Sequence, residues 1–586
     1  MTDTRSDCSE ADAPARSCSW AQRAILGAVC ALVIVSYAFA ARPGYSVPTR
    51  LNPSYDYYNL LVDGFRAGQL GLKLAAPPGL AQLADPYDPD ANARYQLLDM
   101  SYYKGRLYLY FGVTPALVLF WPYAVLTGHY LVQKNAVVIF CSTGFLACAW
   151  LLHSLWRRCF AGVSVAVVAI GTLALGLASG TLLLLARSDV YEVSISCGYA
   201  LSMLALAAIW KALHDSSHRA WWLAAASVAF GLAVGARPTL LVGAVILVVP
   251  VIQAWRERRP IGGTLAAALG PIALIGVGLM FYNYRRFDDP LEFGWHYQLS
   301  AKSQVVREVF SPRFLWFNFR VYFLEPVRWT GRFPFVREPA LPRLPAGYGQ
   351  PMNCLGVLVN IPVVWLALAV ALLWRTQPGR ADANALRWFT GAVGWQFAMC
   401  ALALGMFRSS NPRYELDFLP GLVLLAAIGI LALERALAGC PRRRRAMRWV
   451  WGFLLCFSVA FNLCAGVERG AEAHNNSGRA LLKSGNVPGA IAQFDQALRL
   501  WPDFAEAHNN LGGALWKTGD VRGAIDQFER ALRVEPDDAA ARYNLGVALE
   551  QDGRIQEAIG QYEHALRINP DFVEARNALA QARAAH

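Results

Sequence analysis

Charged residues are scarce in this 586-residue chain: they make up 16% of it, while hydrophobic residues make up 55%. An average soluble domain carries about 25% charged residues, so the composition excludes an ordinary soluble protein. Apolar runs near or above the ~18 to 20 residues needed to cross a bilayer recur up to residue 466. These runs lie at 24–41, 133–152, 160–186, 190–211, 263–283, 353–374, 386–406, 416–437 and 448–466. The sequence therefore predicts a multi-pass membrane protein.

Cysteine pairs with metal-binding spacing are also absent from the sequence. The 12 cysteines are scattered without a CxxC, and most lie in apolar runs, where a thiol behaves as a small hydrophobe. The sequence DPYDPD places Asp85, Asp88 and Asp90 close together, which could bind a divalent cation, but alternating Pro and Asp is also ordinary turn chemistry. No metal ligand and no cofactor is predicted, and a divalent cation stays an open alternative.

A 34-residue period fills the end of the chain. Segments 471–504, 505–538 and 539–572 align without gaps, and each has a glycine at the expected end of its first helix and a proline near its own end. This pattern resembles the tetratricopeptide repeat, a pair of packed helices. The resemblance implies an α-solenoid over 471–586 that ends in a cap helix after residue 572.

One asparagine recurs in the first helix of each repeat, at Asn476, Asn510 and Asn544. Stacked repeats would align the three amides, and an amide can both donate to and accept from the backbone of an extended peptide. The row is similar to the asparagine ladder of tetratricopeptide-bearing O-glycosyltransferases, which implies binding of an acceptor peptide. The alternative is that these amides only hydrogen-bond neighbouring helices.

Basic residues orient the membrane domain, predicted over 23–467 with about 11 spans. Lys and Arg accumulate in cytoplasmic loops, and the short clusters lie at 155–159, 211–219, 255–259, 374–380 and 441–448. On this assignment residues 1–22 form a disordered cytoplasmic tail. Loops 42–106 and 284–352 and the repeats are extracytoplasmic. The expected location is a bacterial inner (plasma) membrane. Orientation in the lipid bilayer accounts for the excess of Lys and Arg in the loops, so no nucleic-acid partner is predicted.

Two segments do not fit simple spans. The run 107–128 contains Pro115 and Pro122, and we expect a broken or re-entrant element there. Arg237 and Pro238 interrupt another apolar run, which predicts two short spans with Arg237 at the turn between them. The fold is predicted to be all-α, a helical membrane domain followed by the solenoid.

The charged residues that interrupt the apolar runs are predicted to meet on the extracytoplasmic face. An arginine can hold a lipid phosphate through paired hydrogen bonds, and a carboxylate can take a proton from an attacking hydroxyl. We expect Arg237, with Arg187 or Arg413, to bind the phosphate. The full set is Asp56, Asp63, Asp99, Lys104, Arg106, Arg187, Asp189, Glu192, Arg237, Arg408, Arg413, Glu415 and Asp417.

Four segments of the predicted outer face form a recognisable set: YDYYNLLVDGFRAGQL, LLDMSYYKGRLYLYFGVTPAL, GLAVGARPTLL and NPRYELDFLP. They resemble segments of the membrane glycosyltransferases of the C superfamily, which include protein O-mannosyltransferases and lipid A aminoarabinose transferases. The resemblance implies transfer of a sugar from a polyprenyl-phosphate donor to a hydroxyl of a protein or glycolipid. It implies a base in the first outer loop, where the candidates are Asp56, then Asp99 and Asp63. The spacing of these acids departs from the mannosyltransferase pattern.

Two other functions remain open. A polysaccharide ligase or polymerase is also a multi-span protein, but its main outer loop is expected late in the chain. A non-enzymatic scaffold could use the repeats to gather envelope proteins, although an anchor needs a single span.

Overall fold

The computed structural model describes residues 19–41, 57–92, 95, 100–299, 309–337, 339, 341–349, 351–352, 354–374 and 381–584. Two compact units are present. The membrane unit comprises Met1–Phe39, Val47–Pro326 and Pro339–Asn462, and the repeat unit comprises Ala40–Ser46, Val327–Glu338 and Leu463–His586. The chain is mostly helical, as predicted.

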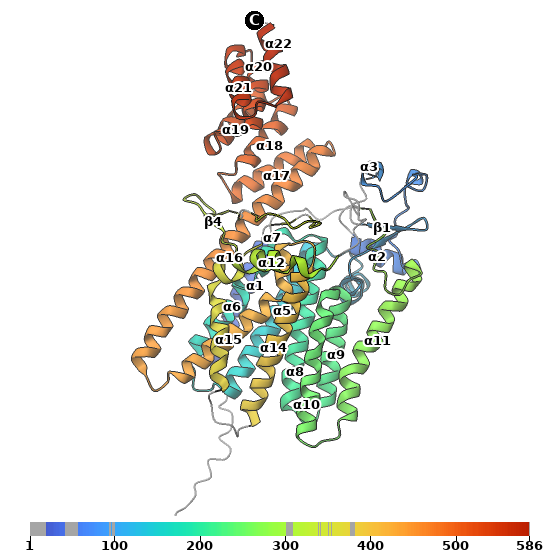
Figure 1. Cartoon of the computed structure of the whole chain (residues 1–586), viewed down its shortest axis with the longest axis vertical. Helices are drawn as coiled ribbons and strands as arrows, with labels where there is room; N and C mark the ends of the chain where they lie inside the picture. The colour runs from blue at the N-terminus through green and yellow to red at the C-terminus, as the bar shows by residue number, and fades with distance from the viewer. Residues whose placement is uncertain are drawn as a thin grey trace, which may run out of the picture. The chain divides into compact units, whose positions relative to one another are not determined.

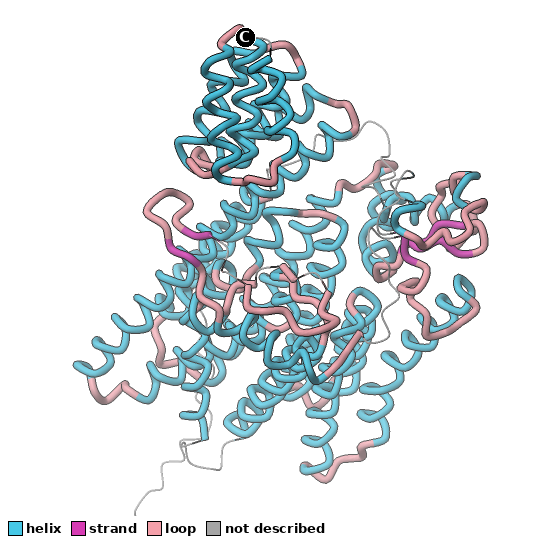
Figure 2. Tube along the Cα trace, turned by 45° about the horizontal axis from the view of Figure 1, so that its top comes forward, coloured by secondary structure: helices cyan, strands magenta, loops and turns pink. Residues whose placement is uncertain are grey.

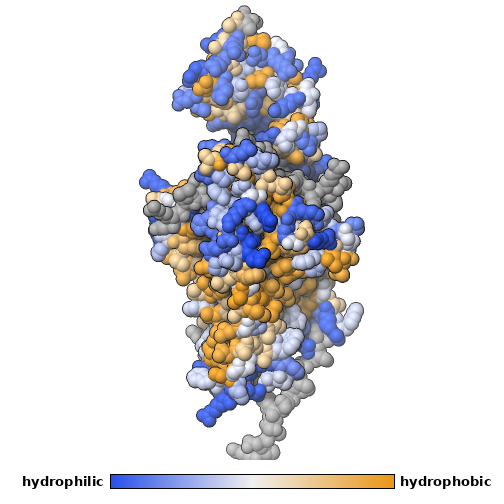
Figure 3. Space-filling model, turned by 90° about the vertical axis from the view of Figure 1, so that its right-hand side faces the viewer, coloured by the Kyte–Doolittle hydropathy of each residue, from blue (hydrophilic) through white to orange (hydrophobic). Residues whose placement is uncertain are grey.

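Ten of the described helices are long and apolar enough to cross a membrane. Figure 1 shows these helices running side by side in the membrane unit, and Figure 3 shows apolar side chains covering much of one lateral face of this bundle. They are α1 (Trp20–Ala40), α5 (Gln133–Cys159), α6 with α7 (Val165–Leu177, Thr181–Arg187), α8 (Val190–His214), α9 (Arg219–Ala236), η4 with α10 (Pro238–Val248, Val249–Arg256), α11 (Gly262–Phe287), α14 (Ala381–Met406), α15 (Leu419–Ala436) and α16 (Pro441–Lys483).

Two apolar helical segments are shorter than these. One is η7 (Pro362–Trp374), which is not among the ten candidate spans that stand against the predicted number of about 11. The other is η3 with α4 (Ala116–Phe120, Trp121–Thr127), so the run 107–128 is interrupted as predicted. Pro115 stands at the N-cap of η3, where its missing N–H costs no helical hydrogen bond.

Helix α8 lies at the centre of the membrane unit, packed against α5 and α9. Small residues allow the close approach: a Cβ on Gly144 of α5 would lie 2.5 Å from the ring of Tyr199 of α8. Trp210 at the other end of α8 is also buried and donates from its indole nitrogen to Ser154 of α5 (2.9 Å). Close helix packing through small residues is the usual means of association in bilayers, where burial from water gives no driving force.

Two small β-sheets interrupt the helical architecture, and the sequence did not predict them. Strands β1 (Met100–Tyr103), β2 (Arg106–Leu109) and β3 (Gln298–Leu299) form an antiparallel sheet in the order β2-β1-β3, which joins the two predicted outer loops. Lys104 and Gly105 both have positive φ in the tight β1–β2 turn, where glycine is favoured. The second sheet pairs β4 (Arg328–Trp329) with β5 (Val336–Arg337).

Short helices complete the loops of the membrane unit. Figure 2 shows how little strand accompanies them. They are α2 (Tyr57–Arg66), η1 (Pro78–Leu80), α3 (Pro89–Asn92), η5 (Pro312–Phe314), α12 (Leu315–Phe319), η6 (Arg320–Leu324), α13 (Val357–Asn360) and η8 (Pro412–Asp417).

The repeat unit contains three helix pairs and a final helix, as the 34-residue period predicts. The first helix of repeat 1 is the end of α16, and the other helices are α17 (Val487–Leu500), α18 (Ala505–Lys517), α19 (Val521–Val534), α20 (Ala539–Gln551), α21 (Ile555–Ile568) and α22 (Val573–Ala584). Phe528 and Tyr562 are buried against Gly512 and Gly546, where an added Cβ would lie 2.7 Å and 2.5 Å from the rings.

A recurrent contact joins successive repeats at their turns. His508, Arg542 and Arg576 each bond the carbonyl of the proline six residues earlier, at 2.9, 2.7 and 2.6 Å. Each proline lies two residues after the end of a helix, so its carbonyl has no helical partner, and the basic side chain of the next helix satisfies it.

Phe528→Ala should destabilise the repeat unit by about 3–5 kcal/mol, because it removes a buried ring that the rigid glycine face of α18 cannot replace. Glu529→Ala, at the exposed neighbouring position, is the matched control. Trypsin cleavage within 471–586 of the full-length protein, followed over time, measures the difference. Equal cleavage rates in the two variants would contradict this account of the repeat core.

Candidate functional site

Arg237 lies at the break between two spans, as predicted. Pro238 disfavours a helical conformation at the residue before it, and Arg237 accordingly ends α9 with an extended backbone. Gly198 of α8 provides space for its side chain, since an added Cβ there would lie 3.0 Å from Cγ of Arg237. The local sequence therefore turns this guanidinium into the bundle at the end of α9.

Asp417 of η8 neutralises Arg237. Nη2 of Arg237 lies 2.7 Å from Oδ2 of Asp417, and Nε lies 3.4 Å from Oδ1. The hydroxyl of Thr239 donates to the same Oδ2 at 3.0 Å, and the Asp417 side chain is only 2% exposed. This paired geometry is the strongest form of arginine–carboxylate contact.

Glu192 is shared by two other arginines. Its Oε1 lies 3.4 Å from Nη1 of Arg413 and 3.9 Å from Nε of Arg187, and its Oε2 accepts from the backbone N–H of Asp189. Asp189 caps α8 by accepting from Val190 N–H, and its other oxygen lies 3.8 Å from Arg187. Nε of Arg413 is buried and has no hydrogen-bond partner. These two arginines are thus held more loosely than Arg237.

Two tyrosines connect the ion pairs. The guanidinium of Arg413 lies 3.9 Å from the ring centre of Tyr191, and that of Arg237 lies 4.9 Å from the ring of Tyr414. Arg413 is also 5.8 Å from the Tyr414 ring. We call the residues Arg187, Asp189, Glu192, Arg237, Arg413 and Asp417 the arginine cluster. The structure therefore brings together all three arginines predicted to bind phosphate.

Asp189 is a candidate acid that the ranking of bases from the sequence did not include. Burial and the neighbouring charge of Glu192 raise the pKa of Asp189, while Arg187 acts in the opposite direction. A carboxylate with a raised pKa beside arginines has the properties of a group that exchanges protons. Its position as the acid three residues before Glu192, directly before an apolar helix, is the capping-box pattern that sequence reading could have identified.

The three predicted bases have different outcomes. Asp63 lies on α2, where it accepts from the hydroxyl of Tyr130 (2.7 Å) and lies 3.9 Å from Arg66, and it makes none of the contacts of the arginine cluster. Asp56 and Asp99 lie outside the described residues. Their roles stay predictions.

The other charged residues of the predicted face are dispersed. Lys104 pairs with Asp288 at 2.6 Å. Glu415 is buried, and it accepts from Leu355 N–H at 2.8 Å through one oxygen, while the other has no partner. Burial raises the pKa of Glu415 to about 8, and the Leu355 hydrogen bond opposes the rise.

The described residues contain no group of three or more His, Cys, Asp or Glu side chains that could hold a metal ion. In the sequence DPYDPD, Asp85 accepts from Tyr87 N–H and Asp88 accepts from Asp90 N–H. These are the hydrogen bonds of ordinary turns, which was the alternative to cation binding for this segment. A divalent cation requirement stays untested.

The predicted amide row of the repeats is partly used between helices. Nδ2 of Asn510 donates to Asn475, and Nδ2 of Asn544 donates to Asn509, both at 2.9 Å. Asn476 is exposed in the first repeat. The amides therefore tie each repeat to the one before it, and their role in binding a peptide stays a prediction.

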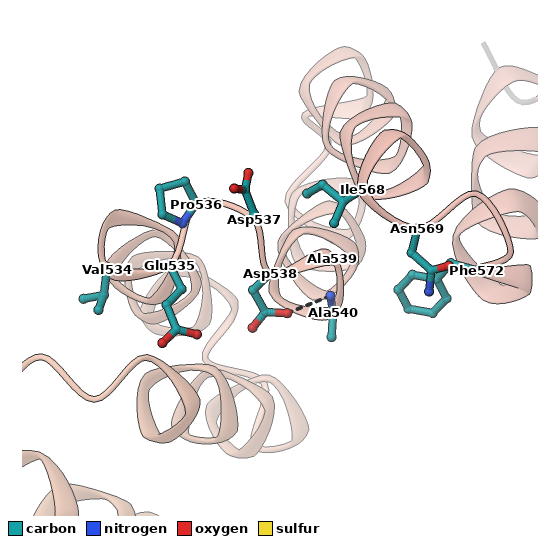
Figure 4. A pocket seen from close by; sticks show the side chains of 10 residues that line it. All are labelled: Val534, Glu535, Pro536, Asp537, Asp538, Ala539, Ala540, Ile568, Asn569 and Phe572. Carbon is teal, nitrogen blue, oxygen red and sulfur yellow. Dashed lines mark hydrogen bonds between the residues drawn. The ribbon is translucent and has the colours of Figure 1, made fainter. Parts of the chain in front are cut away.

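A cavity of about 740 Å³ lies at the turns of the last repeat, as Figure 4 shows. Its acidic wall is the turn before α20, with Glu535, Asp537 and Asp538, and Ile568 and Phe572 form an apolar wall. Glu535 also pairs with Arg337 of β5 at 3.2 Å.

Comparison with known proteins identifies the repeats. A family model described as tetratricopeptide repeat matches residues 475–530 and 513–571. No curated protein matches the chain.

Solved structures match about a fifth of the chain. The first repeat domain of Spaghetti (RPAP3) bound to an HSP90 peptide is 22% identical, and the match covers 20% of this chain and 91% of that one, with a TM-score of 0.19. MamA is 28% identical over 20% of this chain and 67% of its own, with a TM-score of 0.19. An O-GlcNAc transferase of Thermobaculum terrenum is 28% identical, and the match covers 19% of this chain and 22% of that one, with a TM-score of 0.19. The chain is a helical, membrane-type protein that carries C-terminal tetratricopeptide repeats.

The Arg237–Asp417 pair should behave as a buried ion pair. Asp417→Ala should destabilise the protein by about 3–5 kcal/mol, because it leaves the guanidinium without a counterion. The double variant Arg237→Met with Asp417→Leu should recover most of this loss. Thermal unfolding in detergent measures both, with Lys104→Ala, which removes an exposed pair, as the control. An Asp417→Ala variant as stable as the Lys104→Ala control would contradict the account of Arg237 and Asp417 as a buried ion pair.

Glu415 should make stability pH-dependent. The pKa is raised from 4.5 to about 8 in the folded state, so the stabilising contribution is present below pH 4.5 and is lost as the pH rises through about 8. Glu415→Gln mimics the neutral form and should remove this part of the decline. The measurement is the unfolding temperature of both proteins between pH 5 and 9. A parallel decline in the two proteins would show that Glu415 is not the titrating group.

Proposed function

We propose that the membrane unit is a glycosyltransferase that moves a sugar from a polyprenyl-phosphate donor to a hydroxyl on the extracytoplasmic face. The observation that carries the proposal is the loose sharing of Glu192 by Arg187 and Arg413, at 3.4–3.9 Å, beside an acid whose pKa is raised. Arg413, whose buried Nε has no hydrogen-bond partner, suits a phosphate, which accepts several hydrogen bonds at once. Arg237 fits a structural role better, because Asp417 already matches its charge.

The proposed reaction is a single inverting displacement. The acceptor oxygen forms a bond to the anomeric carbon as the bond from that carbon to the phosphate oxygen breaks, and the electron pair leaves with the phosphate. Arg187 and Arg413 stabilise the charge that develops on the departing phosphate. A carboxylate takes the hydroxyl proton, and the candidates are Asp56 and Asp189, with Asp99 and Asp63 as the other predicted bases.

The repeats would present the acceptor in this proposal. Tetratricopeptide arrays are binding surfaces, and the support in this chain is the exposed Asn476 and the half-buried Asn510 and Asn544, which lie at equivalent positions of successive repeats. Their bonds to Asn475 and Asn509 use an amide N–H and leave the side-chain carbonyls to accept from a peptide.

The direct test is incubation of purified full-length protein with labelled polyprenyl-phosphate sugars and candidate acceptors. Asp189→Asn or Asp56→Asn should lower turnover by about 10²–10⁴-fold if that residue is the base. Arg413→Ala and Arg187→Ala should lower turnover by about 10–100-fold, and Asp85→Asn, in an exposed turn, should not change it.

Two results would overturn parts of the proposal. Full activity in both the Asp56→Asn and Asp189→Asn variants would remove them as bases. Absence of turnover with every donor, in a protein whose repeats still capture envelope proteins, would favour the non-enzymatic scaffold.

A further inference from the structure

A cavity of about 340 Å³ lies in the membrane unit between the chain that follows α2 and the turn that begins β2. This volume is at the lower end of the range for small-molecule pockets, about 300–1,000 Å³. Residues of two stretches line it, which are Gln69, Gly71, Leu72, Lys73, Leu74, Ala75 and Ala76, and Gly105, Arg106 and Leu107.

Backbone contacts hold these two stretches together. Leu72 N–H donates to Leu107 at 2.9 Å, Lys73 N–H donates to Leu60 at 3.1 Å, and Ala75 pairs with Arg106 in an antiparallel bridge. Gly71 is required at the closest approach, since an added Cβ would lie 2.9 Å from the carbonyl oxygen of Leu107. The cavity is therefore built by ordered backbone and is not formed by side chains alone.

The charge of the cavity is unbalanced. Lys73 and Arg106 both line it, and none of the described residues lining it is acidic. Neither side chain has an ion-pair or hydrogen-bond partner within the described part of the chain. The neighbouring cations differ in this respect: Lys104 pairs with Asp288, and Arg66 lies 3.9 Å from Asp63.

We propose that this cavity binds a phosphate group, with Lys73 and Arg106 as its two cationic contacts. Two unpaired cations match the charge of a phosphate monoester, which carries up to two negative charges at neutral pH, better than that of a carboxylate, which carries one. An arginine supplies paired donors and a lysine supplies a point charge, and the small residues Ala75 and Gly105 are exposed, which leaves the backbone there open to a ligand. The site shares no residue with the arginine cluster.

The phosphate could belong to a soluble molecule or to a lipid headgroup, and the binding test separates the two. Purified full-length protein is titrated with inorganic phosphate and with glycerol phosphate, and affinity is followed by calorimetry. Lipid retention is measured by native mass spectrometry after reconstitution in nanodiscs that contain phosphatidic acid, a lipid phosphate monoester, or a phosphate-free glycolipid. Neither measurement requires sugar transfer, so failure of the transferase proposal and failure of this one are distinguishable.

The variants are Lys73→Ala and Arg106→Ala, and the matched control is Lys104→Ala, which removes the same charge two residues from Arg106. Each of the first two should weaken phosphate binding about tenfold, and the control should not. Soluble phosphate binding with this pattern identifies a free ligand, and the same pattern for phosphatidic acid alone identifies a headgroup. Absence of binding to both, or an equal loss in the control, would overturn the proposal.

Discussion

The cost of placing a charge among apolar helices constrains the whole membrane unit. A guanidinium or carboxylate buried without a partner is unstable, so each must find an opposite charge or a set of hydrogen bonds. Arg237 finds Asp417, which lies 180 positions later in the chain. That one contact ties the break between α9 and η4 to η8 and the start of α15, and the remaining arginines and acids are arranged around the same helix ends.

The arginine cluster therefore combines two kinds of ion pair. Arg237 and Asp417 are paired closely and fix the geometry, whereas Arg187 and Arg413 lie at longer distances from Glu192, and Nε of Arg413 has no hydrogen-bond partner. Tyr191 and Tyr414 pack on the guanidinium faces and orient them. A rigid pair beside a looser set is a suitable arrangement for a site that must bind and release an anion.

Much of this could be predicted from the sequence, and the reasons are physical. Three gapless copies of one period specify the repeat fold, and span length and Arg237-Pro238 specify where helices begin and break. The distribution of charge among the loops predicted that Arg187, Arg237 and Arg413 lie on one face, as candidates for binding phosphate. The identity of each counterion could not be predicted, because Asp417 and Glu192 become partners only through packing of distant helices. The sheet of β1, β2 and β3 was missed because its strands are two to four residues long and one of them comes from a different loop.

The shared Glu192 has a further consequence for selectivity in the proposed reaction. A ligand that binds Arg187 and Arg413 must compete with a carboxylate that is covalently part of the same site and so acts at a high effective concentration. Chloride and other weakly bound monovalent anions cannot displace Glu192 from these arginines, while a phosphate that offers several oxygens can. The acid that balances the cluster would thus also act as a filter, keeping the arginines available in a salty medium for the ligand that matches them.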